Sequence, residues 1–123
     1  MPKTEVVIFA EEDGSSPLIE WLDGLSPKVQ DKCIVRIERL AEIGHELRRP
    51  EADFLRDGIY ELRWKSEGLQ FRVLYFFHKG KAVLSHGNTK EAEGPPKEID
   101  MAIRRREMFE KNPNKHAYEG GLK

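Results

Sequence analysis

The stretch that decides the fold runs from Gly58 to Lys90 and reads GIYELRWKSEGLQFRVLYFFHKGKAVLSHGNTK. It contains three runs rich in aromatic and β-branched residues, which are Ile59–Lys65, Leu69–Phe77 and Lys81–His86. Short breaks that contain glycine separate the runs. This pattern is typical of three antiparallel strands joined by tight turns, so we expect a meander at the centre of a sheet.

The middle run is nearly all apolar, and Arg72 interrupts it. Its apolar character suits a central strand covered on both faces. A guanidinium stays charged near neutral pH, and burying it without a partner is expensive. Arg72 must therefore either pair with a carboxylate or face a water-filled site that favours positive charge, and the pattern alone leaves both readings open.

Two serine–proline pairs, Ser16-Pro17 and Ser26-Pro27, precede the meander. Each combines a helix N-cap with a proline suited to the first helical position. We expect helices over 17–23 and 27–43, each followed by a glycine that ends it. An apolar stripe at helical spacing marks the second helix, at Val29, Cys33, Ile37 and Leu40. The two helices form a hairpin that can cover one face of the sheet.

The rest of the chain completes an α+β pattern. Thr4–Phe9 is expected as a first strand, Leu47–Arg56 as a polar loop, and Lys97–Glu110 as a final helix. The order β-α-α-β-β-β-α predicts an antiparallel sheet core with an N-terminal helical hairpin and a C-terminal helix. We place this domain at 1–112 and expect 113–123 to be a mobile C-terminal tail.

Composition narrows the class of protein. The chain has 123 residues, 38% of them hydrophobic and 35% charged, which fits one small domain with a thin core. The chain has a single cysteine, Cys33. One cysteine cannot form an intrachain disulfide, and we do not expect a cysteine-based zinc site. No run is long enough to span a membrane or to act as a secretory signal, so a cytoplasmic location is expected. We expect no cofactor and no metal.

The first hairpin brings charged side chains together. Side chains alternate between the faces of a strand, so Glu61 and Arg63 share one face. An even-length turn around Glu67-Gly68 places Arg72 on that face as well. The alternative is structural, with Glu61 and Arg63 forming an ordinary ion pair along the strand.

The second hairpin decides whether His86 joins this group. A three-residue loop over 78–80 pairs Arg72 with His86, whereas a two-residue loop sends the two to opposite faces. We choose the three-residue loop. The alternative is a hydrogen-bonded structural histidine at a strand end. Surface positions without metal-ligand spacing are expected for His45, His78 and His116.

The resulting set of side chains suits phosphodiester cleavage without a metal. A ribose 2′-hydroxyl needs a base, and the leaving 5′-oxygen needs a proton donor. His86 or Glu61 can act as base or acid. The negative transition state can be stabilised by fixed guanidinium groups, here Arg63 and Arg72. Lys90, just beyond the third run, is placed to contact phosphate.

An ordered set of segments resembles a known family. The set consists of Gly58–Arg63, Phe71–Phe77, Val83–Gly87, Lys90, the prolines at 95–96 and the arginines at 104–106. It resembles the phage-related HigB-like branch of the RelE/HigB toxin superfamily of toxin–antitoxin systems. In that superfamily a proline precedes a closing helix rich in arginine, and basic residues on the sheet form the catalytic set.

The resemblance implies a RelE-like microbial RNase toxin fold and the toxin role in a type II toxin–antitoxin system. It implies an mRNA endoribonuclease that acts on the ribosome, and a cognate antitoxin with a helix-turn-helix domain. A homodimer and a toxin–antitoxin hetero-oligomer both stay open. It assigns catalysis to Arg63 and Arg72, followed by His86, and RNA or ribosome contacts to Lys90, Arg104 and Arg105.

Three expectations follow for individual arginines. Arg72 is expected to be functional, so that its replacement by alanine abolishes activity and changes the thermal midpoint little. The stem of Arg106 is expected to pack along the apolar stripe of the last helix, and Arg104 and Arg105 are expected to be freer. The competing functions are a non-catalytic, phage-derived interaction module of the same fold that keeps antitoxin binding, and a small domain of unrelated role.

Overall fold

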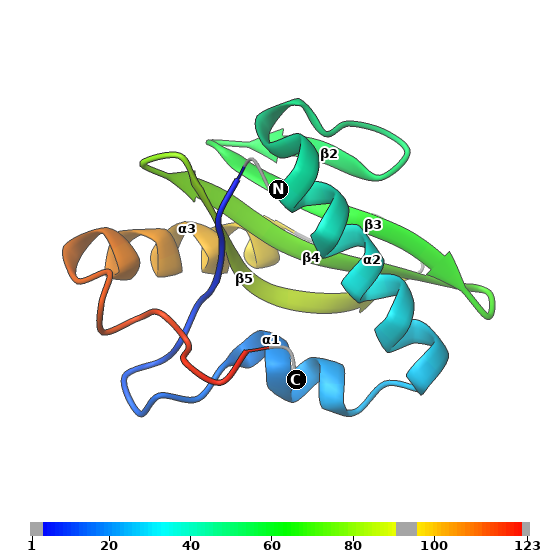
Figure 1. The fold of residues 1–123 in the computed structure, drawn as a ribbon, viewed down its shortest axis with the longest axis horizontal. Coiled ribbons are helices and arrows are strands. Elements are labelled where there is room, and N and C mark those ends of the chain that lie inside the picture. Colours follow the sequence, from blue (N-terminus) through cyan, green and yellow to red (C-terminus); the bar gives the residue numbers. More distant parts are fainter. Residues whose placement is uncertain (1–3, 91–95, 122–123) are drawn as a thin grey trace.

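A five-stranded sheet forms the centre of the molecule (Figure 1). The computed structural model describes residues 4–90 and 96–121, with only the backbone of Lys90. The strands are β1 (Val6–Ile8), β2 (Ala52–Arg56), β3 (Ile59–Ser66), β4 (Leu69–His78) and β5 (Lys81–Lys90). They lie in the order β1-β5-β4-β3-β2, with β1 parallel to β5 and the other neighbours antiparallel. The predicted meander and the α+β class are confirmed.

Helices cover both faces of this sheet (Figure 1). They are α1 (Pro17–Asp23), α2 (Pro27–Ile43), followed by the single turn η1 (Gly44–Glu46), and α3 (Pro96–Lys111). The first two begin where the serine–proline pairs predict, because Oγ of Ser16 and Oγ of Ser26 each accept a bond from a backbone N–H of the first turn. Among the described residues, no helix is both long and apolar enough to cross a membrane.

The core is divided between the two faces because strand side chains alternate. Leu62, Val73 and Tyr75 point toward α1 and α2, and Leu74 and Phe76 point toward α3. Trp64 and Leu84 are buried with the first group, and Ile59 and Val83 with the second. The central strand β4 is thus covered on both sides, as its apolar sequence predicts.

The helix α1 is anchored on the sheet by Trp21. Its ring lies over Gly87 of β5, where an added Cβ would stand 2.0 Å from Cε3 of the indole. Nε1 of Trp21 donates to Oγ1 of Thr89 at 3.2 Å. The ring also packs at the edge of Trp64 and against Phe71. Because Gly87 has no side chain, the Trp21 ring fits against β5 and holds α1 on the sheet.

The expected loop over 47–56 is wrong in its second half, because Ala52–Arg56 forms the edge strand β2. Only Ala52 of this strand is fully buried, and Phe54 is 47% exposed. A short edge strand with one covered position shows little of the apolar alternation by which strands are recognised. The strand matters for the site because it adds Asp53 opposite Glu61.

The second hairpin corrects the predicted register. His78 pairs with Lys81 across a two-residue turn, so the three-residue loop is wrong. Such a turn alone would place Arg72 and His86 on opposite faces. The register shifts by one residue between Leu74 and Tyr75, and this bulge restores the shared face. Arg72 consequently lies opposite Asn88 rather than His86.

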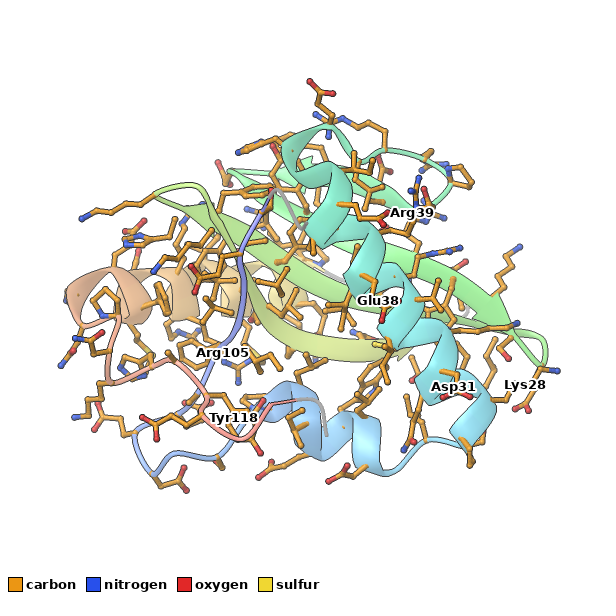
Figure 2. All side chains as sticks on the ribbon, viewed as in Figure 1. Lys28, Asp31, Glu38, Arg39, Arg105 and Tyr118 are labelled. Carbon is orange, nitrogen blue, oxygen red and sulfur yellow. The ribbon has the colours of Figure 1, made fainter. Side chains whose placement is uncertain are left out.

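The segment expected to be a mobile tail also differs from its prediction. His116 is 3% exposed, and its Nδ1 donates to the carbonyl of Ala10 at 2.7 Å. The backbone N–H of Tyr118 donates to Ile8 at 2.7 Å, and Ala117 forms a bridge with Phe9. Figure 2 shows Tyr118 where this segment passes α1. His116 is therefore not a surface residue, because it stacks on Phe9.

Candidate active site

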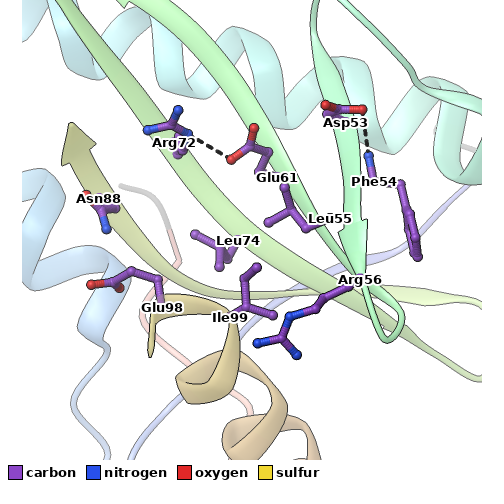
Figure 3. A pocket seen from close by; sticks show the side chains of 10 residues that line it. All are labelled: Asp53, Phe54, Leu55, Arg56, Glu61, Arg72, Leu74, Asn88, Glu98 and Ile99. Carbon is purple, nitrogen blue, oxygen red and sulfur yellow. Dashed lines mark hydrogen bonds and ion pairs between the residues drawn. The ribbon is translucent and has the colours of Figure 1, made fainter. Parts of the chain in front are cut away.

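Two arginines face each other on the α3 side of the sheet. Arg63 and Arg72 are directly opposite in the register of β3 and β4, which confirms the predicted shared face. Glu61 lies beside them, and its Oε1 is 2.9 Å from Nε of Arg72 (Figure 3). Both side chains of this ion pair are 5% exposed. Of the two readings that the sequence leaves open for Arg72, the carboxylate partner is present.

The guanidinium of Arg72 is nevertheless incompletely bonded. Its Nε lies close to Glu61, but neither Nε nor Nη1 makes a geometrically sound hydrogen bond to any described residue. The contact is therefore an ion pair rather than an aligned hydrogen bond. A buried donor without a partner is costly. These two nitrogens are fully covered, while the Arg72 side chain forms part of the cavity wall.

Arg63 is held less tightly than Arg72. Its Nη1 is 3.7 Å from Oδ2 of Asp53, and its Nε is 3.8 Å from Oε2 of Glu61. The side chain is 20% exposed, four times the exposed fraction of Arg72. The positive charge of Arg63 is thus the more available of the two for an incoming anion.

A cavity of about 200 Å³ lies between this charged strip and α3 (Figure 3). Its walls are formed by Asp53, Phe54, Leu55, Arg56, Glu61, Arg72, Leu74, Asn88, Glu98 and Ile99. The first turn of α3 supplies the last two residues, so the helix closes one side. The cavity brings three carboxylates, two arginines and an amide together, groups that can bind a phosphate ester and accept a proton from a neighbouring hydroxyl.

His86 lies on the same face but is not part of the cavity wall. Its Nδ1 is 2.8 Å from Oγ of Ser85, and its Nε2 is 2.9 Å from Oε1 of Glu98. Burial lowers the pKa of His86, and the nearby charge of Arg105 acts in the same direction, against the hydrogen bond to Glu98. The neutral ring therefore donates through Nε2 to Glu98 and accepts at Nδ1 from the serine hydroxyl. This is the bonding of a structural histidine.

The lowered pKa of His86 makes stability dependent on pH. The unfolded chain binds a proton at this residue near pH 6.5, whereas the folded chain binds it only at lower pH. Stability is therefore fully present above about pH 6.5 and falls as the pH is lowered through the interval between the two pKa values. We expect urea unfolding of the wild type to show this fall, and His86→Gln to show a smaller one. Equal slopes in both proteins would contradict the assignment.

The three expected RNA-contact residues have different surroundings. Lys90 ends β5, and its side chain lies outside the described residues. Arg104 is exposed, as expected. The expectation that Arg105 is free is wrong, because its Nη2 is 3.1 Å from Oε2 of Glu11 and its guanidinium lies 5.7 Å from the ring centre of Phe9. The sequence places these partners far from Arg105 along the chain, so no local pattern indicates them.

The head group of Arg106 reaches a different partner from the one predicted. The residue is half-buried, and its Nη1 donates to the backbone carbonyl of Asp57 at 2.6 Å. The sequence predicts a head group that reaches solvent or a carboxylate. The carbonyl is available because Asp57 lies in the turn between β2 and β3, where the backbone is not paired with a strand.

Eight of the ten residues that line the cavity were not predicted as site residues, among them Asp53, Asn88 and Glu98. Asp53 was missed together with its strand. Asn88 was missed because the third run of the meander continues to Lys90 rather than ending at His86. Glu98 could have been found as an acidic residue in the first turn of a helix, where the helix dipole favours a carboxylate.

The charges of the site are nearly balanced. Each arginine of the pair lies near a carboxylate, at 2.9 Å for Arg72 and at 3.7 Å or more for Arg63. A phosphate must therefore compete with Asp53 and Glu61 for these cations. In the part of the chain that the structure describes, no three His, Cys, Asp or Glu side chains gather in a way that could hold a metal ion.

Comparison with known proteins identifies the family. The family model described as "Phage derived protein Gp49-like" matches residues 20–107, which include α2, the whole meander and most of α3. No curated protein matches the chain. The matched segment contains every residue of the arginine pair and of the cavity. The chain therefore belongs to the Gp49-like family of phage-derived proteins, which is part of the RelE/HigB-like toxin superfamily.

Proposed function

We propose that this protein is the toxin of a type II toxin–antitoxin system and cleaves messenger RNA on the ribosome. The observation that carries the proposal is the pair of facing arginines, Arg63 and Arg72, of which Arg72 lines the cavity that α3 closes on one side. Membership of the Gp49-like family supports it. The HigB-like branch and a helix-turn-helix antitoxin are part of the same proposal, and they rest on the resemblance of the sequence.

The proposed reaction uses the chain's own side chains. The 2′-hydroxyl of the ribose gives its proton to a carboxylate, and its oxygen forms a bond to phosphorus. The bond from phosphorus to the 5′-oxygen breaks, and that oxygen takes up a proton from water while the carboxylate returns its proton to solvent. Glu61 is better placed than His86 to act as the base, because it lines the cavity and both ring nitrogens of His86 are occupied. Arg63 and Arg72 stabilise the charge that develops on the phosphate.

The test is induced expression in a bacterial host, with and without the neighbouring gene, together with mapping of cleaved messages. We expect growth arrest that the neighbouring product relieves, and fragments that end in a 2′,3′-cyclic phosphate or a 3′-phosphate. Arg63→Gln should lower the cleavage rate by about 100-fold or more, the cost of removing one transition-state donor. It should leave the thermal midpoint near that of wild type, since the contacts of Arg63 are long.

The matched control is Arg39→Gln. Arg39 lies on α2, on the opposite side of the sheet, and is 42% exposed with carboxylate partners of its own. This variant should cleave as fast as wild type. If Arg63→Gln and Arg39→Gln cleaved equally well, the catalytic role of the arginine pair would be rejected.

A non-catalytic interaction module is the second candidate. The close pairing of Arg72 with Glu61 and the complete bonding of His86 favour it, because both place potential catalytic groups in structural contacts. Under this alternative the wild type neither arrests growth nor cuts RNA, yet still binds the product of the neighbouring gene. Growth arrest and co-purification therefore separate the two candidates.

A further inference from the structure

A groove between α2 and β3 lies apart from the cavity described above. It has a volume of about 280 Å³ and is lined by Asp31, Lys32, Val35, Arg36, Trp64 and Lys65. A second hollow of about 250 Å³ shares the last three of these residues and extends to Arg63 of the arginine pair. We call the first hollow, without this extension, the α2–β3 groove. Figure 2 shows the part of α2 beside it, where Lys28 and Asp31 are labelled.

The groove carries positive charge that is poorly neutralised. Its lining contains three cations and one carboxylate. Within residues 4–90 and 96–121, neither Lys32 nor Lys65 forms an ion pair with a carboxylate, and Arg36 reaches Glu51 only at 3.9 Å. This contrasts with the candidate active site, where a carboxylate lies 2.9 Å from Arg72. The groove is therefore the better place for an anionic partner.

The groove follows an open edge of the sheet. The pairing of β2 with β3 reaches only Leu62, so beyond it β3 has β4 on one side and, among the described residues, no strand on the other. Nε of Arg36 donates to the carbonyl of Arg63 at 2.7 Å, and Nζ of Lys32 donates to that of Lys65 at 3.3 Å. In an antiparallel strand the N–H and C=O of one residue point the same way. The N–H of Lys65 consequently faces the open edge, as a donor to an extended chain.

The apolar floor of the groove indicates which kind of anion fits. Val35 is 50% exposed on α2 beside Trp64, which is only 4% exposed. A buried indole gives no open face on which a nucleic-acid base could stack. An aliphatic side chain, in contrast, would cover Val35 and gain from leaving water. An exposed aliphatic side chain surrounded by cations favours a peptide that has an aliphatic side chain flanked by carboxylates.

We propose that the α2–β3 groove binds an extended acidic segment of a partner protein. An aliphatic side chain of that segment covers Val35, and its carboxylates meet Lys32, Arg36 and Lys65. The residues that make these contacts do not include the arginine pair, so this docking function is separate from RNA cleavage, although the adjoining hollow reaches Arg63. The proposal therefore stands or falls without any measurement of nuclease activity.

The experiment measures binding of a fluorescein-labelled peptide, Glu-Glu-Leu-Glu-Glu, to the purified full chain by fluorescence anisotropy. We expect saturable binding that weakens as salt rises. Val35→Asp, and the double variant Lys32→Glu with Lys65→Glu, should each weaken it by about tenfold or more. The peptide Gln-Gln-Leu-Gln-Gln should bind more weakly than the acidic one to the wild type.

The control is the double variant Lys79→Glu with Lys81→Glu, which makes the same change of charge on the hairpin between β4 and β5. It should bind the peptide like the wild type. Lys65→Gln is a milder second variant in case the charge reversals disturb folding, which the thermal midpoint reports. Absence of saturable binding, or an equal loss in the control, would overturn the proposal. The proposal would also be overturned if a short poly-uridine RNA bound the chain more tightly than the acidic peptide and Val35→Asp did not change the affinity for that RNA.

Discussion

Arg72→Ala is expected to lower the free energy of unfolding by about 3–5 kcal/mol, the usual cost of removing one partner of a buried ion pair. The reason is that Glu61 stays behind in a site where its side chain is 5% exposed, without the cation 2.9 Å away. Urea unfolding followed by tryptophan fluorescence measures the loss. The expectation that Arg72→Ala changes the thermal midpoint little is thereby revised, since the sequence alone does not decide between a carboxylate partner and a water-filled site for Arg72.

A double variant separates the charge from the packing. Glu61→Leu combined with Arg72→Met replaces the pair by apolar side chains, and this should recover most of the stability that Arg72→Ala loses. Arg39→Ala is the surface control, with an expected change within about 0.5 kcal/mol. A small loss in Arg72→Ala would mean that water solvates Glu61 through the cavity, and it would remove the structural role of the pair. Any activity assay of Arg72 variants needs this measurement first.

Gly87→Ala is the substitution with the second largest expected effect, a loss of about 1–3 kcal/mol from overpacking. The new methyl group would stand 2.0 Å from the Trp21 ring. The ring has little freedom to move, because it is hydrogen-bonded to Thr89 and packed against Trp64 and Phe71. We expect α1 to be displaced, and near-ultraviolet circular dichroism of the indoles to change along with the unfolding midpoint.

Gly24→Ala is the matched control for this change. A Cβ at Gly24 would meet only the carbonyl of Trp21 at 3.6 Å, an ordinary contact. The same chemical change at that position should alter stability within about 0.5 kcal/mol. Combining Gly87→Ala with Trp21→Phe should cost less than the sum of the two single changes, because the smaller ring vacates the space. Additive losses would show that Gly87 is needed for a reason other than the fit of Trp21.

The sequence predicts best those features that depend on neighbouring residues. The two serine–proline pairs define the starts of α1 and α2, because capping involves groups only three positions apart. The facing positions of Arg63 and Arg72 follow from a tight turn and simple alternation. Both features are local, and the chain needs no distant contact to form them.

The features that the sequence does not predict depend on contacts between distant segments. The bulge near Leu74 keeps His86 on the arginine face, yet no residue pattern distinguishes it from a regular ladder. The partner of Arg105 is Glu11, which is distant in the chain and close only after folding. The sequence places Glu61 on the same face as Arg72. The burial of Glu61, however, depends on β2 and α3. These are the contacts that decide whether the cations of the site are available.

The packing of the C-terminal segment on β1 has a consequence for self-association. β1 lies at one edge of the sheet, and its sequence, Val6-Val7-Ile8, is of the kind that pairs readily with a second chain. The backbone of Tyr118 and His116 occupies hydrogen-bonding groups of Ile8 and Ala10 on the outer side of that edge. Residues 116–118 thus cover the outer edge of a strand that would otherwise be open to pairing, much as a charged or covered edge protects other sheets from aggregation.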